Sequence, residues 1–164
     1  MTRKFSVPLL AFALALAAPA ATHAGTFTGF GPHFGFSSGP SQLVLGGHLE
    51  LVDVAPDIDF VPSIDLGLGD NVTLISLNGD FHYRFHLHGQ RWQPYAGAGV
   101  GVHFFSFDQL GPGVDNSETR AGGHFIVGAD VPTKTGSRFF TELKLGFGDG
   151  PDLKVLAGWS FRLR

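Results

Sequence analysis

The chain has 164 residues, a formal net charge of −3 and no cysteine, and 15% of its residues are charged. This length suits one domain, the net charge argues against nucleic acid as a partner, and the lack of cysteine excludes disulfides, thiol chemistry and a lipoprotein anchor. Charged residues fall well below the roughly 25% typical of soluble domains, and the mean hydropathy is +0.15.

Residues 1–24 have the pattern of a secretory signal peptide. Arg3 and Lys4 give a positive start, Leu9–Ala18 forms a short apolar run, and Thr22–Ala24 offers small residues before a cleavage site. A membrane anchor helix is the alternative, but this run is short and prolines flank it. We predict a cleaved signal that exports the chain through the inner membrane. No later run is long and apolar enough to predict a transmembrane helix.

The mature domain, residues 25–164, begins with three predicted strands. They cover Thr26–Phe36, Leu43–Val54 and Asp57–Leu68, and each alternates between apolar and polar side chains. Pro62 is a difficulty because proline cannot donate a ladder hydrogen bond to a neighbouring strand. We therefore expect a bulge or a short break near Pro62.

The clearest strand is Val72–His88. Odd positions there are mostly apolar or aromatic, whereas even positions from Ser76 onward are polar or charged. Successive side chains of an extended strand point to opposite faces, so the segment predicts one apolar face and one polar face. Its length exceeds the 5–6 residues typical of soluble strands and meets the roughly 9–11 residues that cross a membrane.

Gly89-Gln90 predicts a hairpin between this strand and the next, because glycine at the first of two loop residues suits a type II′ turn. The implied register sets bulky polar residues opposite glycines on one face. The predicted pairs are His88 with Arg91, Leu87 with Trp92, Arg84 with Tyr95, His82 with Gly97, Asp80 with Gly99, and Asn78 with Gly101. A narrow closed interior needs this arrangement of large against small.

The remaining chain predicts one long loop and three more strands. Asp108–Glu118 is polar and rich in glycine and aspartate, and we expect it to be the longest loop. Strands follow at Thr119–Val131, Arg138–Phe147 and Leu153–Leu163. In the last five strands every charged residue lies at one of the alternating positions that form the polar face. A lipid-facing surface without charges requires this arrangement.

Together these segments predict an all-β fold, an eight-stranded antiparallel up-and-down transmembrane β-barrel with its polar face inside. The even strand number places both termini on the periplasmic side and the long loop outside the cell. Periodicity alone also allows a soluble, lipocalin-like barrel that hides its apolar face and binds an apolar ligand. The low charge and the aromatic residues near strand ends favour the membrane, and these are Trp92, Phe139, Trp159 and Phe161.

Two segments resemble the small outer-membrane β-barrel family of opacity-like and OmpA-barrel-like proteins. They are Pro94–Gly101 (P-Y-A-G-A-G-V-G) and Gly158–Leu163 (G-W-S-F-R-L). The resemblance implies an integral barrel in the outer membrane of a Gram-negative bacterium, with outer-membrane lipid around it and no fixed activity. It also implies that Gly158–Leu163 is read by the barrel-assembly machinery, although Arg164 stands where such signals usually have a terminal aromatic.

Histidines and one serine invite two chemical hypotheses. His86 and His88 share a face, with Arg91 and Gln93 opposite, but zinc needs three or four ligands and the neighbouring arginines oppose a cation. The register also sets Ser76 opposite His103, a possible nucleophile and base for acyl transfer, with no acid obviously placed to orient the imidazole. An enzyme that modifies outer-leaflet lipid is therefore a distant alternative.

The expected interior suits a plug better than a pore. An eight-stranded barrel is just wide enough to be filled by its own side chains. Charges of both signs are expected to pair across it, from Glu50, Asp80, Arg84, Arg120, Glu142, Lys144, Lys154 and Arg162. We predict a non-enzymatic protein with a structural or surface-interaction role, and with no catalytic, cofactor or metal residue. Its other partners are left open, and the acidity of the long loop hints at a cationic one.

Overall fold

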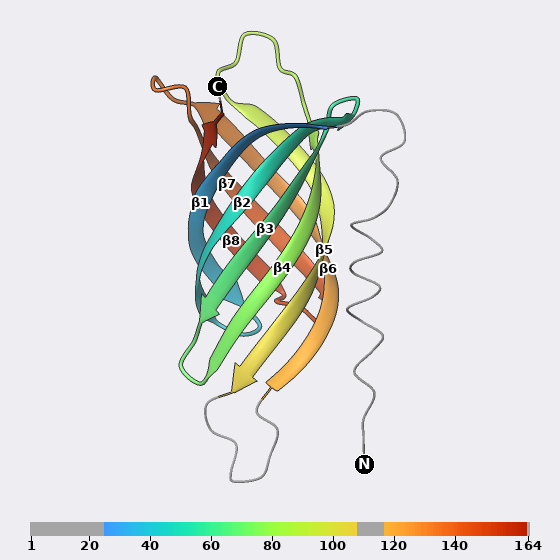
Figure 1. Cartoon of the computed structure of the whole chain (residues 1–164), viewed down its shortest axis with the longest axis vertical. Coiled ribbons are helices and arrows are strands. Elements are labelled where there is room, and N and C mark those ends of the chain that lie inside the picture. Colours follow the sequence, from blue (N-terminus) through green and yellow to red (C-terminus); the bar gives the residue numbers. More distant parts are fainter. Residues whose placement is uncertain (1–24, 108–116, 164) are drawn as a thin grey trace.

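The computed structural model describes residues 25–107 and 117–163, and these form one closed antiparallel barrel of eight strands (Figure 1). The predicted signal peptide and residues 108–116 of the predicted long loop lie outside the described residues. In chain order the strands are β1 (Thr26–Ser38), β2 (Gln42–Ala55), β3 (Ile58–Leu68), β4 (Val72–Arg84), β5 (Gln93–Phe107), β6 (Ser117–Pro132), β7 (Arg138–Gly148) and β8 (Leu153–Arg162).

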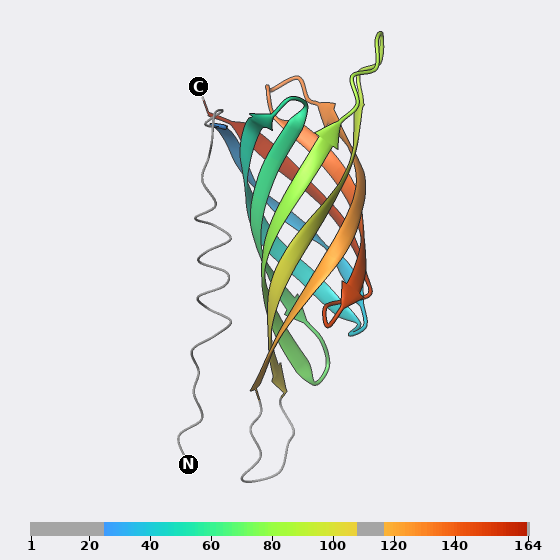
Figure 2. The same cartoon turned by 90° about the vertical axis from the view of Figure 1, so that its right-hand side faces the viewer.

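Closure joins the first strand to the last. Each strand pairs with its neighbours in sequence, and β1 pairs antiparallel with β8, for example Phe30 with Phe161 and His33 with Gly158. A closed sheet leaves no unpaired edge for other chains to extend. The strands tilt around a common axis, and the start of β1 lies at the same end as the end of β8 (Figure 2). We call this the terminal end.

The central hairpin has the predicted register. Arg84 pairs with Tyr95, and the ladder continues through the predicted glycine pairs as far as Val72 with Phe107. The predicted turn is wrong by one residue, because the chain turns at His88–Gly89, where Gly89 has a φ of 78°. The predicted strand is also too long, since β4 ends at Arg84 and the pairs of His88 with Arg91 and Leu87 with Trp92 are not formed.

The irregularity expected near Pro62 occurs on one side of β3 only. Pairing of β3 with β4 continues through Pro62 and Gly79, whereas the paired residues of β2 and β3 skip from His48–Ser63 to Leu51–Phe60. The register shift itself lies further along β2, between Leu51 and Ala55. Pairing therefore breaks where proline cannot donate to a ladder, while the bulge forms elsewhere.

The two faces of the wall have the predicted orientation. Phe81, Leu143 and Val155 point outward and are 52%, 38% and 51% exposed. Arg84 and Lys144 point into the lumen and are 8% and 4% exposed. The alternation continues around the described barrel, so its outer surface is apolar, and its interior is mostly polar with a few buried apolar side chains. None of the described residues forms a helix long and apolar enough to span a membrane.

Two segment boundaries differ from the prediction. Ser117 and Glu118, predicted as the end of the long loop, are the first residues of β6 and pair with the end of β5. Asp57, predicted as the polar start of a strand, lies in the two-residue turn before β3 with a φ of 60°. Strand ends are set by where pairing with a neighbour stops, which alternation does not encode.

Candidate functional site

The lumen is filled by three groups of charged and polar side chains along its axis. The first group lies toward the terminal end. Arg84 forms ion pairs with Asp59 and Asp130, while Arg138 pairs with Glu50 and also lies 3.6 Å from Asp130. All five are buried, so each charge is compensated by a partner from another strand.

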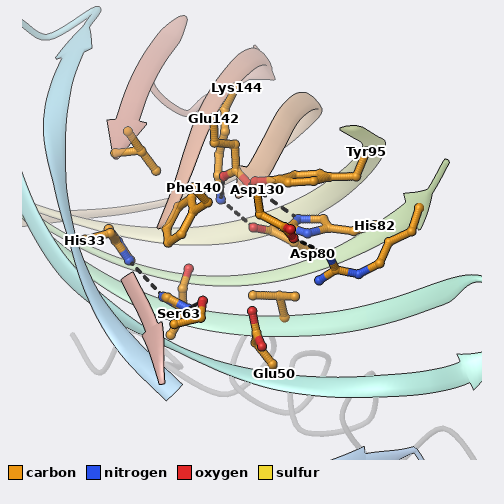
Figure 3. A pocket seen from close by; sticks show the side chains of 15 residues that line it. His33, Glu50, Ser63, Asp80, His82, Tyr95, Asp130, Phe140, Glu142 and Lys144 are labelled. Carbon is orange, nitrogen blue, oxygen red and sulfur yellow. Dashed lines mark hydrogen bonds and ion pairs between the residues drawn. The ribbon is translucent and has the colours of Figure 1, made fainter. Parts of the chain in front are cut away.

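The second group lies at the centre and joins β4 to β7 across the lumen. Lys144 forms an ion pair with Asp80, and its ammonium lies 3.4 Å from Glu142. Asp80 is also bonded to the imidazole of His124 at 2.7 Å, and the Tyr95 hydroxyl donates to Glu142 at 2.9 Å. Figure 3 shows Asp80, Tyr95, Glu142 and Lys144 converging from facing walls.

The third group centres on Asp65. Its carboxylate accepts hydrogen bonds from Lys154 at 2.7 Å and Asn78 at 3.0 Å, and the His33 imidazole lies 2.7 Å away. A further polar contact links His48 to the Ser160 hydroxyl at 2.8 Å, and Ser160 pairs across β7 and β8 with Arg138 of the first group. The Asp65 group therefore lies beyond the central group, toward the end of the barrel opposite the terminal end.

Little empty volume is left among these groups. The cavity at the centre of the lumen measures about 30 Å³ and is lined mostly by charged and aromatic side chains (Figure 3). A volume of this size holds about two water molecules. Glycines make this density possible: a Cβ at Gly99 would overlap the Asp80 carboxylate and come within 2.6 Å of His124 Nε2.

The predicted contact between Ser76 and His103 is confirmed. His103 Nδ1 lies 2.9 Å from Ser76 Oγ, and the two residues pair across β4 and β5. Ser76 is 0% exposed, and within the described chain no Asp or Glu forms a hydrogen bond with His103. This geometry offers a substrate no path to the hydroxyl and gives the imidazole no orienting acid. That the protein is not an enzyme stays a prediction.

Three possible metal ligands lie together in the central group, at a place that the sequence did not indicate as a metal site. Asp80, His82 and Glu142 each offer a ligand atom, and these atoms lie within 4.8 Å of one another. His82 Nε2 is buried, lies 3.6 Å from Glu142, and has no hydrogen-bond partner within the described residues. However, the Lys144 ammonium pairs with Asp80 and lies near Glu142, so a fixed positive charge already lies against both carboxylates.

We therefore expect zinc not to bind the folded protein at this group. Two positive charges in contact with the same carboxylates repel each other strongly in a poorly solvated interior. Isothermal titration of zinc chloride into the folded barrel in detergent should show no saturable heat. A saturable heat that disappears in the His82→Ala variant would contradict this expectation.

His86 and His88 do not lie in the closed lumen, which corrects the prediction for that pair. Both fall in the connection after β4, where strand pairing has stopped. His86 is largely exposed and lies 3.4 Å from Asp57 in the neighbouring turn. With Arg91 they line a cavity at the terminal end instead.

Two of the charges expected to pair across the lumen do not. Arg120 pairs at 2.6 Å with Glu118, two residues away on the same strand and exposed to solvent. Arg162 is exposed at the end of β8 and lines the terminal-end cavity. Both lie near strand ends, where the polar phase opens to the outside. The other predicted charges are buried in the lumen and form ion pairs there. Several of their partners were not among the residues predicted to pair, and these are Asp59, Asp65, Asp130 and Arg138.

Solved structures with the same fold include two bacterial barrels. The structure of Neisserial surface protein A superposes with a TM-score of 0.66 at 13% identity, covering 84% of this chain and 96% of that one. The N-terminal β-barrel domain of Pseudomonas aeruginosa OprF gives a TM-score of 0.64 at 15% identity, covering 85% and 99%. No protein-family model matches the chain, and a search of curated proteins finds no match. At these identities the likeness shows the fold.

Proposed function

We propose that the protein is an integral outer-membrane β-barrel of a Gram-negative bacterium, with a structural or surface-interaction role and no open pore. The observation that carries the proposal is that the distribution of apolar and charged side chains is the reverse of that in soluble proteins. Apolar side chains such as Val100, Phe125 and Val127 cover the outside of a closed barrel, while charged side chains fill its core. A continuous exposed apolar surface of this kind marks a membrane-facing or partner-facing protein.

Strand length and aromatic placement support insertion into a bilayer. The strands run from 10 residues in β8 to 16 in β6, and about 9–11 tilted residues cross the hydrocarbon core. Around the terminal end lies an aromatic girdle, which we define as Trp92, Phe139, Trp159 and Phe161. Phe139 and Trp159 contact each other edge to face with ring centroids 5.1 Å apart. Such girdles lie at membrane interfaces in barrels of this class.

The same lumen argues against the soluble alternative. A barrel that carries an apolar ligand needs an apolar interior, whereas the centre here holds Asp80, Glu142 and Lys144 in contact with one another. It also argues against a pore, because the residual cavity of about 30 Å³ holds isolated waters rather than a channel. The name of one structural neighbour, a surface protein, agrees with the proposal.

Export and assembly complete the proposal. Residues 1–24 act as the cleaved signal, the terminal end faces the periplasm, and Gly158–Leu163 engages the assembly machinery. In β8, Trp159 and Phe161 point outward beside the seam with β1, where an assembly factor reaches them before closure. Loops at the end opposite the termini are then the surface available to extracellular partners.

Expression of the full chain in a Gram-negative host tests the proposal. We expect the folded protein in the outer-membrane fraction, with an electrophoretic mobility that changes when the sample is boiled, because closed barrels resist detergent until heated. Purified barrel should also float with lipid vesicles and give no steady conductance in planar bilayers. Recovery in the soluble periplasmic fraction would contradict membrane insertion, and stable single-channel steps would contradict the closed lumen.

A further inference from the structure

The terminal end carries a second, larger cavity that is distinct from the filled lumen. It measures about 270 Å³ and lies between the connection that follows β4 and the ends of β6, β7 and β8. Its lining includes three arginines, two histidines and one tryptophan: Arg91, Arg138, Arg162, His86, His88 and Trp92. Figure 2 shows the β4–β5 connection rising beside the barrel mouth at this end.

The lining has an excess of positive charge. Asp130 contributes a carboxylate, but Arg84 and Arg138 already pair with it. Within the described chain, Arg91 and Arg162 form no ion pair. Among the described residues, Arg91 and Arg162 thus add two guanidinium groups without an ion pair, and the one carboxylate of the lining is already compensated, so the cavity attracts anions.

One buried donor in this lining also has no partner. Arg138 is 7% exposed, and its guanidinium contacts Glu50 and Asp130 through other nitrogens. Its Nε–H is buried and donates to no acceptor among the described residues. Buried donors in proteins are nearly always satisfied, so an unpaired Arg138 Nε at a basic cavity indicates a missing acceptor.

We propose that this cavity binds the phosphate group of an anionic ligand. Guanidinium groups match phosphate oxygens in pairs, and the two imidazoles add further donors. Trp92 belongs both to the lining and to the aromatic girdle, which places the cavity at the level of lipid headgroups. A phospholipid headgroup of the adjacent leaflet and a free phosphate both supply this chemistry. Only the lipid source rests on the membrane insertion proposed above.

Trp92 supplies a direct reporter. The chain has two tryptophans, so the Trp159→Phe variant leaves Trp92 alone. The folded variant in maltoside micelles at low salt is titrated with short-chain phosphatidylglycerol and, separately, with inorganic phosphate. We expect a saturable change in Trp92 fluorescence with at least one of them. Tighter binding of the lipid assigns the headgroup as the source, and equal binding assigns a free phosphate.

Variants of the arginines test the location. Arg91→Gln and Arg162→Gln should each weaken binding about tenfold, since each removes a charge-assisted hydrogen bond to the phosphate. Arg120→Gln, an exposed arginine at the opposite end, is the matched control and should leave binding unchanged. No saturable change with either ligand, or equal weakening by Arg120→Gln, would overturn the proposal. Flotation of all variants with vesicles tests membrane insertion separately.

Discussion

Replacing Lys144 with methionine is expected to lower the free energy of unfolding by about 3–5 kcal/mol, the usual cost of breaking a buried ion pair by removing one partner. Lys144 is the only cation in contact with both Asp80 and Glu142 among the described residues. Methionine keeps the length and the apolar stem of the side chain but removes the charge. Two carboxylates then remain close together in the lumen, and among the described residues Asp80 keeps only its hydrogen bond to His124.

Urea titration of the barrel folded in lipid vesicles measures this loss. The Lys134→Met variant is the matched control, because Lys134 lies exposed in the turn before β7 and its replacement should change stability by less than about 0.5 kcal/mol. Adding Asp80→Asn to Lys144→Met should recover much of the loss, since it removes the carboxylate left without its cation. A Lys144→Met variant as stable as the parent would show that water reaches the lumen freely and screens its charges.

Lys144 also shows how far sequence reasoning reaches. Its place in the polar phase of an alternating segment was enough to predict that it faces the lumen, because side chains in a strand alternate strictly between two faces. The predicted register of β4 with β5 also holds, although the turn lies one residue earlier than predicted, and it sets bulky polar residues opposite glycines on one face. The contact of Ser76 with His103 is a consequence of that register, so the sequence is enough to predict it.

The partners across the lumen were beyond such reasoning. The alternation of side chains along a strand assigns each residue to the inner or the outer face, but it does not give the position of that residue along the barrel axis. The relative positions of residues on distant strands depend on the tilt and stagger of the strands. Asp80 on β4 meets Lys144 on β7 only because three intervening registers bring them level. The grouping of Asp80, His82 and Glu142 depends on the same three strand registers taken together. The pattern of residues within one segment or one hairpin does not contain this information.

The end of β4 was mispredicted for a different reason. Alternation continues through Phe85–His88, but β3 starts at Ile58, which pairs with Tyr83. β6 likewise supports β5 only from Gln93 onward. A longer hairpin would stand alone beyond the barrel, and isolated two-stranded ribbons are only marginally stable in water. The segment forms an irregular connection instead, and this places His86, His88 and Arg91 around the terminal-end cavity.

Placing an arginine on the outside of the barrel separates a membrane protein from a soluble one. Val100 lies midway along β5, points outward and is 58% exposed. In a bilayer, Val100→Arg should lower the free energy of unfolding by about 2–4 kcal/mol, because the charge must sit near the hydrocarbon midplane. In water the same substitution at an exposed position should change stability by less than about 0.5 kcal/mol.

The matched control is Ser106→Arg, on the same strand and the same outward face but near its end. An arginine there reaches the interface, and its cost should fall to about 0–1 kcal/mol. Urea titrations in vesicles measure both variants, and the difference between them removes any general effect of arginine on strand pairing. Because only a hydrocarbon layer makes the cost depend on depth, equal effects at Val100 and Ser106 would contradict the proposed insertion. A loss confined to Val100 would place the membrane midplane at the centre of β5.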